Sequence, residues 1–204
     1  MKHYLNENIY VLHEPGAIQV HPNVFEDAWN FSDSIKSTPN PMNPKYMIKR
    51  KQSTFGAQYN FSGQKSLCIP LDQCPTLVSL VLEDVRRRSG CNDYNVVHTN
   101  WYPDGSAGLD PHADNEKDMI PNMDIYSYTF LSEPGNPRGF QIYSMDDVKK
   151  PKVEVFLDHC DLLIMSKGMQ KCFKHGVKKS QAKKFHNLKR INMTVRAWKV
   201  DLKE

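Results

Sequence analysis

The C-terminal stretch of the chain, residues 190–200, reads RINMTVRAWKV and alternates between polar and apolar side chains. Because successive side chains of a strand point to opposite faces, this alternation predicts a β-strand. The apolar face would pack against a core. The other face carries Arg190 and Arg196, which indicates either a solvent-exposed face or a polar cavity in which arginines bind a carboxylate or phosphate.

Upstream of this strand, short β-branched and aromatic runs alternate with turn residues, and further strands are predicted at 94–102, 125–131, 139–144, 152–156, 161–166 and 171–175. Without helices between them, these strands favour an antiparallel sandwich or barrel. Before Gly90, apolar spacing predicts helices within 22–37 and over 75–89, and the prolines within 34–47 predict an irregular loop. The chain is thus expected to begin with helices and to end in a β core.

Composition excludes several classes of protein. The 204 residues are 39% hydrophobic and 25% charged, which is typical of one globular domain and excludes wholesale disorder, collagen and coiled coils. No apolar run approaches a membrane span, and the N-terminus lacks the apolar segment of a secretory signal. We therefore expect an intracellular protein, nuclear or cytoplasmic rather than secreted, that is monomeric and does not contact a membrane.

Charge is distributed unevenly along the chain. Residues 149–204 contain 15 Lys and Arg but 5 Asp and Glu, whereas residues 1–148 contain 12 and 18. Such asymmetry indicates an anionic partner, with nucleic acid (DNA, RNA or both) first, or else a solvated lysine-rich face. If the segment binds nucleic acid, the residues expected to contact its backbone are Lys178, Lys179, Lys183 and Lys184.

Two His-x-Asp pairs are candidates for metal binding, at His112-Ala-Asp114 and at His159-Cys-Asp161. Alternation along an extended chain places both ligands of such a pair on one face. A third, distant His would complete the two-His-one-carboxylate set that leaves three open positions on iron.

The surroundings of the two pairs differ. His112 follows a turn-rich segment and lies 63 residues before His175, which leaves room for strands to bring a third ligand back. His159 and Asp161 introduce an apolar run and are interpreted as a turn before a core strand. His175 ends a predicted strand, whereas His186 lies in a loop-like basic setting and is the weaker third ligand.

Several segments, in order and spacing, resemble the AlkB-type iron(II)/2-oxoglutarate dioxygenases over roughly residues 47–200. The segments are Asn100-Trp-Tyr102 with Asp104-Gly105, His112-Ala-Asp114-Asn-Glu116, Gln170 to His175, and Arg190-Ile-Asn-Met-Thr-Val-Arg196. Residues 49–56 and 59–63 are similar to the nucleotide-recognition lid of the animal nucleic-acid-repair branch. The chain departs from the family in a longer connection at 131–140 and in Asn115, where charged residues are common.

The resemblance implies an α+β fold, a double-stranded β-helix (jelly-roll) core with N-terminal helices and a nucleotide-recognition lid. One domain would span 1–204, with the helices and lid in 1–90 and the catalytic core in 91–204.

The resemblance also implies roles for individual residues. Fe(II) would be held by His112, Asp114 and His175. The co-substrate 2-oxoglutarate would be bound by Asn100, Tyr102, Arg190, Asn192 and Arg196, with Arg190 on its distal carboxylate. A flipped base would be contacted by Tyr59, Phe61, Asn115 and Glu116, with Phe61 stacked on it.

The implied activity is oxidative demethylation of N-alkylated bases of the 1-methyladenine and 3-methylcytosine type. Fe(II), 2-oxoglutarate and O2 would be used, and succinate, CO2 and formaldehyde released. Two alternatives stay open. One is the same chemistry on a protein or other substrate that is not nucleic acid, and the other is a nucleic-acid-binding module without catalysis.

Overall fold

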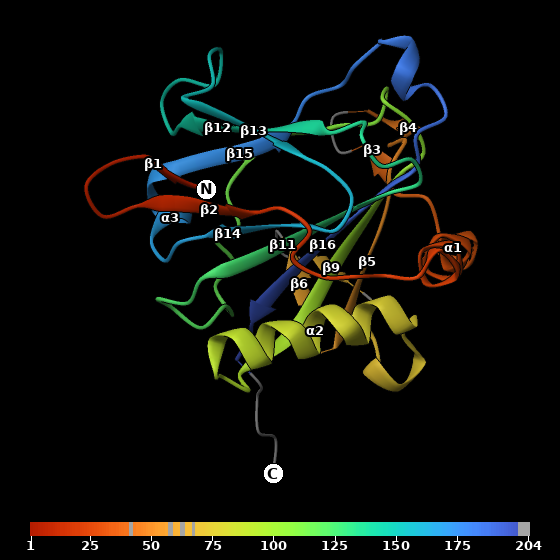
Figure 1. Ribbon diagram of the computed structural model, residues 1–204, viewed down its shortest axis with the longest axis horizontal. Coiled ribbons are helices and arrows are strands. Elements are labelled where there is room, and N and C mark those ends of the chain that lie inside the picture. Colours follow the sequence, from red (N-terminus) through yellow and green to blue (C-terminus); the bar gives the residue numbers. More distant parts are fainter. Residues whose placement is uncertain (41–42, 57–58, 62–63, 67, 200–204) are drawn as a thin grey trace.

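A computed structural model describes residues 1–40, 43–56, 59–61, 64–66 and 68–199, and within them two β-sheets face each other (Figure 1). The larger sheet has the strand order β1 (Lys2–Tyr4), β2 (Tyr10–Glu14), β14 (Asp161–Met165), β11 (Ile125–Leu131), β16 (Arg190–Ala197), β9 (Tyr94–Tyr102), β5 (Lys51–Gly56) and β8 (Cys68–Ile69). The smaller sheet has the order β10 (Leu109–His112), β15 (Phe173–Val177), β12 (Arg138–Ser144) and β13 (Val153–Leu157). All of these neighbours are antiparallel except β5 and β8. The predicted jelly-roll core is confirmed.

The remaining elements are short hairpins and helices. The hairpins pair β3 (Pro39–Asn40) with β4 (Asn43–Met47) and β6 (Tyr59–Phe61) with β7 (Gln64–Ser66). The helices are α1 (Pro22–Asn30), α2 (Thr76–Ser89) and α3 (Met169–Cys172), with 3-10 turns η1 (Phe31–Ser34), η2 (Leu71–Gln73) and η3 (Lys183–Phe185). No helix among the described residues is long and apolar enough to span a membrane.

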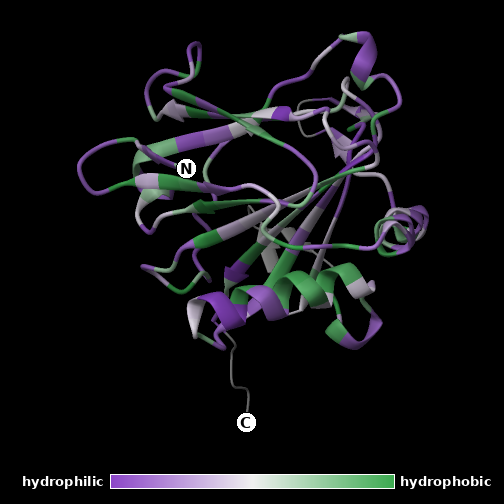
Figure 2. Cartoon of the chain, in the orientation of Figure 1, coloured by the Kyte–Doolittle hydropathy of each residue, from purple (hydrophilic) through white to green (hydrophobic). Residues whose placement is uncertain are grey.

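Helices α1 and α2 cover the outer face of the larger sheet (Figure 1). Buried residues of α2, such as Leu77 and Val81, share one apolar cluster with Ile191 and Met193 of β16. The helix turns hydrophilic toward its C-terminal end and stops at Gly90, whose φ of 65° suits glycine (Figure 2). The odd-numbered side chains of β16 pack against the helices. Because side chains of a strand alternate, the even-numbered side chains of β16 must point between the two sheets.

The space between the sheets is divided into an apolar part and a polar part. Ile125 and Met165 of the larger sheet pack with Ile142 and Leu157 of the smaller one. The polar part is lined by the even-numbered residues of β16, all of which are buried. The exposed-face alternative is thereby excluded, because Arg190 and Arg196, 1% and 3% exposed, lie between the two sheets and do not face open solvent.

The expected order of helices first and strands afterwards is wrong. Strands β1, β2, β5 and β8 precede residue 70 and extend the larger sheet on both sides. They were missed because each gains its stability from partners distant in sequence, as β2 does from β14. The prolines of 34–47 do not exclude structure either, since β3 and β4 form a two-stranded edge hairpin, where proline is tolerated.

Smaller corrections concern the chain around the site. Residues 171–175 are not one strand, because α3 ends at Cys172 and β15 begins at Phe173. The predicted strand 190–200 ends at Ala197, and the strand β10, which carries His112, was not predicted.

Candidate metal and co-substrate site

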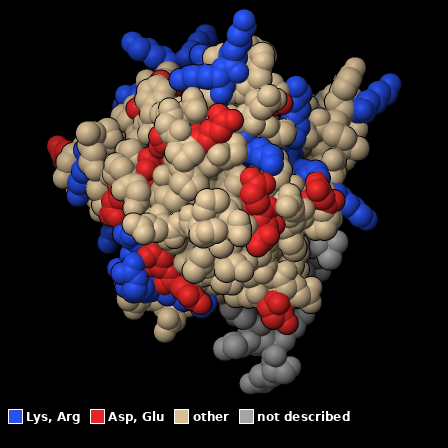
Figure 3. Space-filling model, turned by 45° about the vertical axis from the view of Figure 1, so that its right-hand side comes forward, with Lys and Arg blue, Asp and Glu red and all other residues tan. Residues whose placement is uncertain are grey.

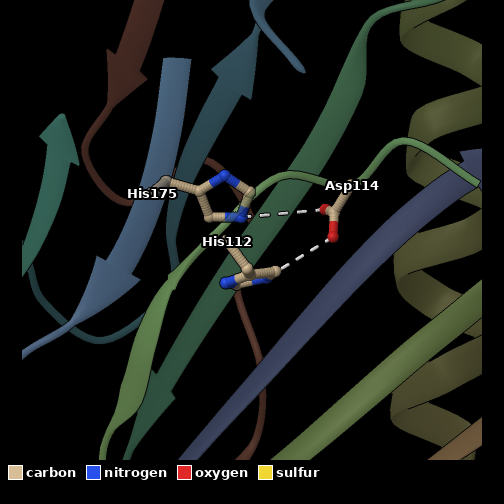
Figure 4. A group of neighbouring side chains, drawn as sticks. All are labelled: His112, Asp114 and His175. Atoms are coloured by element: carbon tan, nitrogen blue, oxygen red, sulfur yellow. Dashed lines mark ion pairs between the residues drawn. The ribbon is translucent and has the colours of Figure 1, made fainter. Parts of the chain in front are cut away.

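Three side chains meet where β10 and β15 pair, between the two sheets (Figure 4). His112 ends β10, Asp114 follows two residues later, and His175 lies opposite His112 in the antiparallel register. Nε2 of His112 is 3.5 Å from Oδ1 of Asp114, and Nε2 of His175 is 3.7 Å from Oδ2. One potential ligand atom from each residue lies within 4.8 Å of the others. Two imidazoles and one carboxylate at this spacing form a candidate two-His-one-carboxylate metal centre.

The protonation states of two of these groups suit metal binding. Burial opposes ionisation of Asp114, but Arg196, whose Nη2 is 2.8 Å from Oδ2, and His112 hold the pKa of Asp114 well below its usual range. Burial, followed by the charge of His112, lowers the pKa of His175 to about 3. Asp114 is therefore ionised and His175 neutral at pH 7, the forms in which each can coordinate a metal.

His112 is the most open member of the triad, with 28% of its side chain exposed. Burial disfavours its charged form, but the hydrogen bond to Asp114 raises its pKa above the ordinary value. Its Nδ1 lies 3.0 Å from the carbonyl oxygen of Asp110, which leaves Nε2 directed toward Asp114. Metal binding at Nε2 would therefore displace any proton held there.

Neighbouring side chains fix the ligands in place. The ring of Phe140 stacks on His175 with a centroid distance of 5.2 Å. The side-chain carbonyl of Gln170 accepts a hydrogen bond of 2.9 Å from the backbone N–H of Asp114. Such supporting contacts set ligand orientation and are worth about 10- to 100-fold in metal affinity or activity.

A candidate carboxylate-binding site, centred on Arg190, lies on the same polar face. Arg190 donates from Nη2 to Thr129 at 3.1 Å, and its Cζ lies 4.9 Å from the ring centroid of Tyr102. Among the described residues, Nε and Nη1 of Arg190 and the hydroxyl of Tyr102 are buried without a hydrogen-bond partner. A buried guanidinium with unused donors fits a carboxylate ligand, because leaving these groups unsatisfied costs free energy.

Two other predicted co-substrate residues are held by protein groups. The side-chain oxygen of Asn100 accepts from Nε of Arg50 at 3.0 Å. The amide nitrogen of Asn192 donates to the hydroxyl of Ser127 and to the carbonyl of Tyr128, both at 2.9 Å. Both asparagines lie on the cavity-facing side of neighbouring strands, and their contact with 2-oxoglutarate stays a prediction.

Three residues of this cavity were missed from the sequence. Arg50 holds Asn100, and His98 lies on β9 two residues before Asn100, hydrogen-bonded to Thr54 at 3.0 Å. Arg138 donates to the carbonyls of Ala107 and Lys178, both at 2.9 Å, so it fixes the loop before β10. Burial, followed by the charge of Arg190, lowers the pKa of Arg138 to about 10. Period-two alternation with Asn100 and Tyr102 could have revealed His98, whereas nothing local indicates Arg138 or Arg50.

Of the predicted base-contacting residues, the structure describes the side chains of Asn115 and Glu116. Asn115 is exposed, while Oε1 of Glu116 lies 3.2 Å from Nη1 of Arg196, in contact with the metal site. Tyr59 and Phe61 belong to β6, but their side chains lie outside what the structure describes. Their stacking on a base stays a prediction.

The basic residues lie at the surface. Lys178, Lys179, Lys183 and Lys184 are all exposed, on the segment that follows β15. His186 is also exposed, directly after η3, and the third member of the triad is His175.

A protein-family model described as the 2OG-Fe(II) oxygenase superfamily matches residues 17–196 of this sequence. The chain belongs to this superfamily. Members use Fe(II) with 2-oxoglutarate and O2 as co-substrates, which agrees with the triad and with the unsatisfied Arg190. No curated protein matches the sequence.

Among solved structures, the chain is similar to OsALKBH1, with 18% sequence identity and a TM-score of 0.56. That match covers 96% of this chain and 99% of the other. A prolyl hydroxylase from Trichoplax adhaerens, in complex with a hypoxia inducible factor oxygen degradation domain peptide fragment, has 13% identity and a TM-score of 0.56. It covers 92% of this chain and 83% of that chain. At these identities the matches establish the oxygenase fold alone.

In this oxygenase, His112, Asp114 and His175 would hold the iron, and Arg190 would hold one carboxylate of 2-oxoglutarate. When bound, the iron and co-substrate supply the oxidising power of the reaction. The protein supplies orientation and buries the side chains of Asp114 and His175. Arg196 keeps Asp114 ionised, and Phe140 and Gln170 keep the ligand set in place.

Proposed function

We propose that this oxygenase demethylates N-alkylated bases in nucleic acid, of the 1-methyladenine and 3-methylcytosine type. The observation that supports the proposal most is the exposed basic segment 178–184 beside the iron-ligand strand. It begins directly after β15, and His175 of β15 is itself a candidate ligand. A polyanion bound there would be held close to the metal centre.

Hydrogen bonds join this segment to the loop that enters the site. The N–H of Gly105 donates to the carbonyl of Phe185, and the N–H of Ser180 donates to the carbonyl of Gly105, both at 2.7 Å. The loop that contains Gly105 connects Tyr102 of the co-substrate pocket to β10 and His112. The basic segment is thus built onto the frame of the site.

The basic side chains are accessible to a large ligand. Lys and Arg gather along the upper edge of the face drawn in Figure 3, the edge at which η3 lies in Figure 1. Lysines that neutralise phosphates release counterions, which gives affinity without sequence preference. The base itself must leave the stack to reach a buried metal, and Asn115 and Glu116 follow Asp114 directly at the place where it would arrive.

The test is mass spectrometry of methylated oligonucleotides incubated with the protein, Fe(II), 2-oxoglutarate and ascorbate. Strands of DNA and RNA that each carry one 1-methyladenine or 3-methylcytosine should lose 14 Da, the mass of CH2. The same strands with Asp114→Ala protein are the control. If 2-oxoglutarate is consumed but no tested strand loses mass, the nucleic-acid assignment is wrong.

A second test addresses the basic segment directly. Neutralising Lys178, Lys179, Lys183 and Lys184 together should weaken oligonucleotide binding and flatten its salt dependence. Each lost phosphate contact should reduce the log–log slope by about 0.7–0.9. Neutralising the exposed Lys2, Lys36, Lys149 and Lys150 is the charge-matched control. If the two variants have equal slopes of log affinity against log salt concentration, segment 178–184 is a solvated surface that does not bind nucleic acid.

Hydroxylation of a protein is the second candidate, because the fold is equally similar to a prolyl hydroxylase. A peptide substrate does not require a cationic surface, so the basic segment favours nucleic acid. A nucleic-acid-binding module without catalysis is disfavoured, because binding alone needs neither the buried triad nor the unsatisfied Arg190.

A further inference from the structure

A groove of about 350 Å³ opens on the outer face of the smaller sheet. Its lining includes Gly139, Glu154, Phe156 and three lysines, Lys178, Lys179 and Lys184. None of these except the lysines enters the proposed function, and the sequence did not single out Phe156.

The floor of the groove depends on glycine. Gly139 and Phe156 are cross-strand partners in the β12–β13 pair, so the aromatic ring has no side chain opposite it. A Cβ at residue 139 would lie 2.3 Å from Oε1 of Glu154, so the glycine makes room for the Glu154 side chain.

Phe156 is unusually exposed for its type, at 58% of its surface. Among the described residues, no other ring stacks on it, unlike the paired rings of the core. An exposed aromatic ring offers a face on which any nucleobase can stack.

The charges around the ring select an anion. Lys178, Lys179 and Lys184 are exposed on one wall, while the carboxylate of Glu154 is engaged at 2.8 Å by the amide of Gln141. An aromatic platform beside several cations is the combination that single-stranded nucleic acid requires, with stacking for a base and cations for phosphates.

We infer that this groove binds a nucleotide of the substrate strand that flanks the target base. One base would stack on Phe156, and its phosphates would lie against the three lysines. Lys178 is three residues beyond His175, roughly 10 Å along an extended chain, so one strand could span the groove and the site. The inference rests on the proposed function, because it takes nucleic acid as the substrate.

The inference predicts that longer single strands are better substrates than a free methylated nucleoside. Loss of one base–aromatic stack weakens binding by about 5- to 150-fold. Phe156→Ala should therefore lower oligonucleotide affinity within this range and lower the ratio of oligonucleotide turnover to nucleoside turnover. Phe156→Trp, which keeps an aromatic face, should restore both.

The experiment measures fluorescence anisotropy of labelled single-stranded oligonucleotides, together with turnover of methylated oligonucleotide and nucleoside. Tyr4→Ala is the matched control, since Tyr4 is an exposed aromatic, at 64%, on β1 and does not line the groove. Neutralising Lys178, Lys179 and Lys184 should weaken binding more than neutralising Lys2, Lys149 and Lys150.

The outcomes separate the groove from the proposed function. If demethylation is equally efficient in the parent, Phe156→Ala and Tyr4→Ala proteins, the groove does not bind a flanking nucleotide, and the proposed function is unaffected. Phe156-dependent oligonucleotide binding without demethylation would support the groove and overturn the function. Binding of a polyglutamate peptide that depends on Phe156, with oligonucleotide binding independent of it, would overturn the groove in favour of an acidic peptide.

Discussion

The two His-x-Asp pairs of this chain share a motif and differ in every contact. At the first, His112 and Asp114 face His175 from the paired strand and Arg196 from the opposite sheet. At the second, His159 bonds through Nδ1 to the backbone of Leu131, and Asp161 is buried against His13. No third metal ligand joins the second pair in the part of the chain that the structure describes.

The second pair instead closes a turn. Oδ1 of Asp161 accepts from the N–H of Gly16 at 3.0 Å, and Oδ2 accepts from the N–H of Asp158 at 2.9 Å. Cys160 between them has a positive φ of 65°. The interpretation as a turn is confirmed, although Asp161 opens β14 and does not lie in the loop. The comparison shows that the neighbours of a His-x-Asp pair decide between metal binding and structural support.

The largest expected effect is at the first pair. Asp114→Ala should lower kcat/KM by more than about 100-fold, because loss of a ligand costs more than the 10- to 100-fold typical of its supporting contacts. Metal affinity, measured by calorimetry with Mn(II), should fall with it. The melting curve should stay cooperative, since Arg196 keeps Glu116 as a partner. Unchanged metal affinity would remove Asp114 from the ligand set.

The Arg190→Ala substitution should have the second-largest effect, on the binding of 2-oxoglutarate. A lost charge-assisted hydrogen-bond pair costs about 1.5–3 kcal/mol, so the apparent KM for 2-oxoglutarate should rise roughly 10- to 100-fold. Oligonucleotide affinity should change little, and this separates a co-substrate ligand from a phosphate contact. An unaltered KM together with weaker oligonucleotide binding would contradict the assignment.

Asp161→Asn should act on stability and not on chemistry. The substitution weakens the contacts with His13, Gly16 and Asp158, and should lower the free energy of unfolding by about 2 kcal/mol. Urea unfolding measures this loss. Turnover per folded molecule and Mn(II) affinity should match those of the parent, and a fall in metal affinity would mean that the second pair also binds metal.

The smallest effect concerns pH and His98, which lies near the first pair. Burial, followed by the charge of Arg196, lowers its pKa to about 3, from 6.5 in the unfolded chain. The unfolded chain therefore takes up this proton first, and stability is lost as pH falls below about 6.5. The parent should lose up to about 1.4 kcal/mol more per pH unit than His98→Gln in urea unfolding between pH 6.5 and 5. Parallel pH profiles would contradict the buried, neutral state.

Much of the core could be predicted from local pattern. The strand over 94–102 and the helix that ends before Gly90 agree with the structure, because period-two and period-3.6 spacing are set by which face is buried. Strands β1, β2 and β10 were missed, since they are short and are stabilised by partners far along the chain. The candidate metal ligands His112, Asp114 and His175 were chosen for their spacing and for the resemblance, and the structure places the three side chains together. Their binding of iron stays a prediction.

The amino-acid sequence is enough to specify the chemical groups of the candidate site, namely two imidazoles, a carboxylate and two arginines on one strand face. The pairing of β10 with β15 then showed that the first His-x-Asp pair, and not the second, has a third potential metal ligand beside it among the described residues. The tertiary structure also decided that Arg190 is buried with unused donors, and that Phe156 is an exposed cross-strand partner of Gly139. Local sequence specifies which way side chains alternate, but the pairing of strands distant in sequence decides which side chains meet.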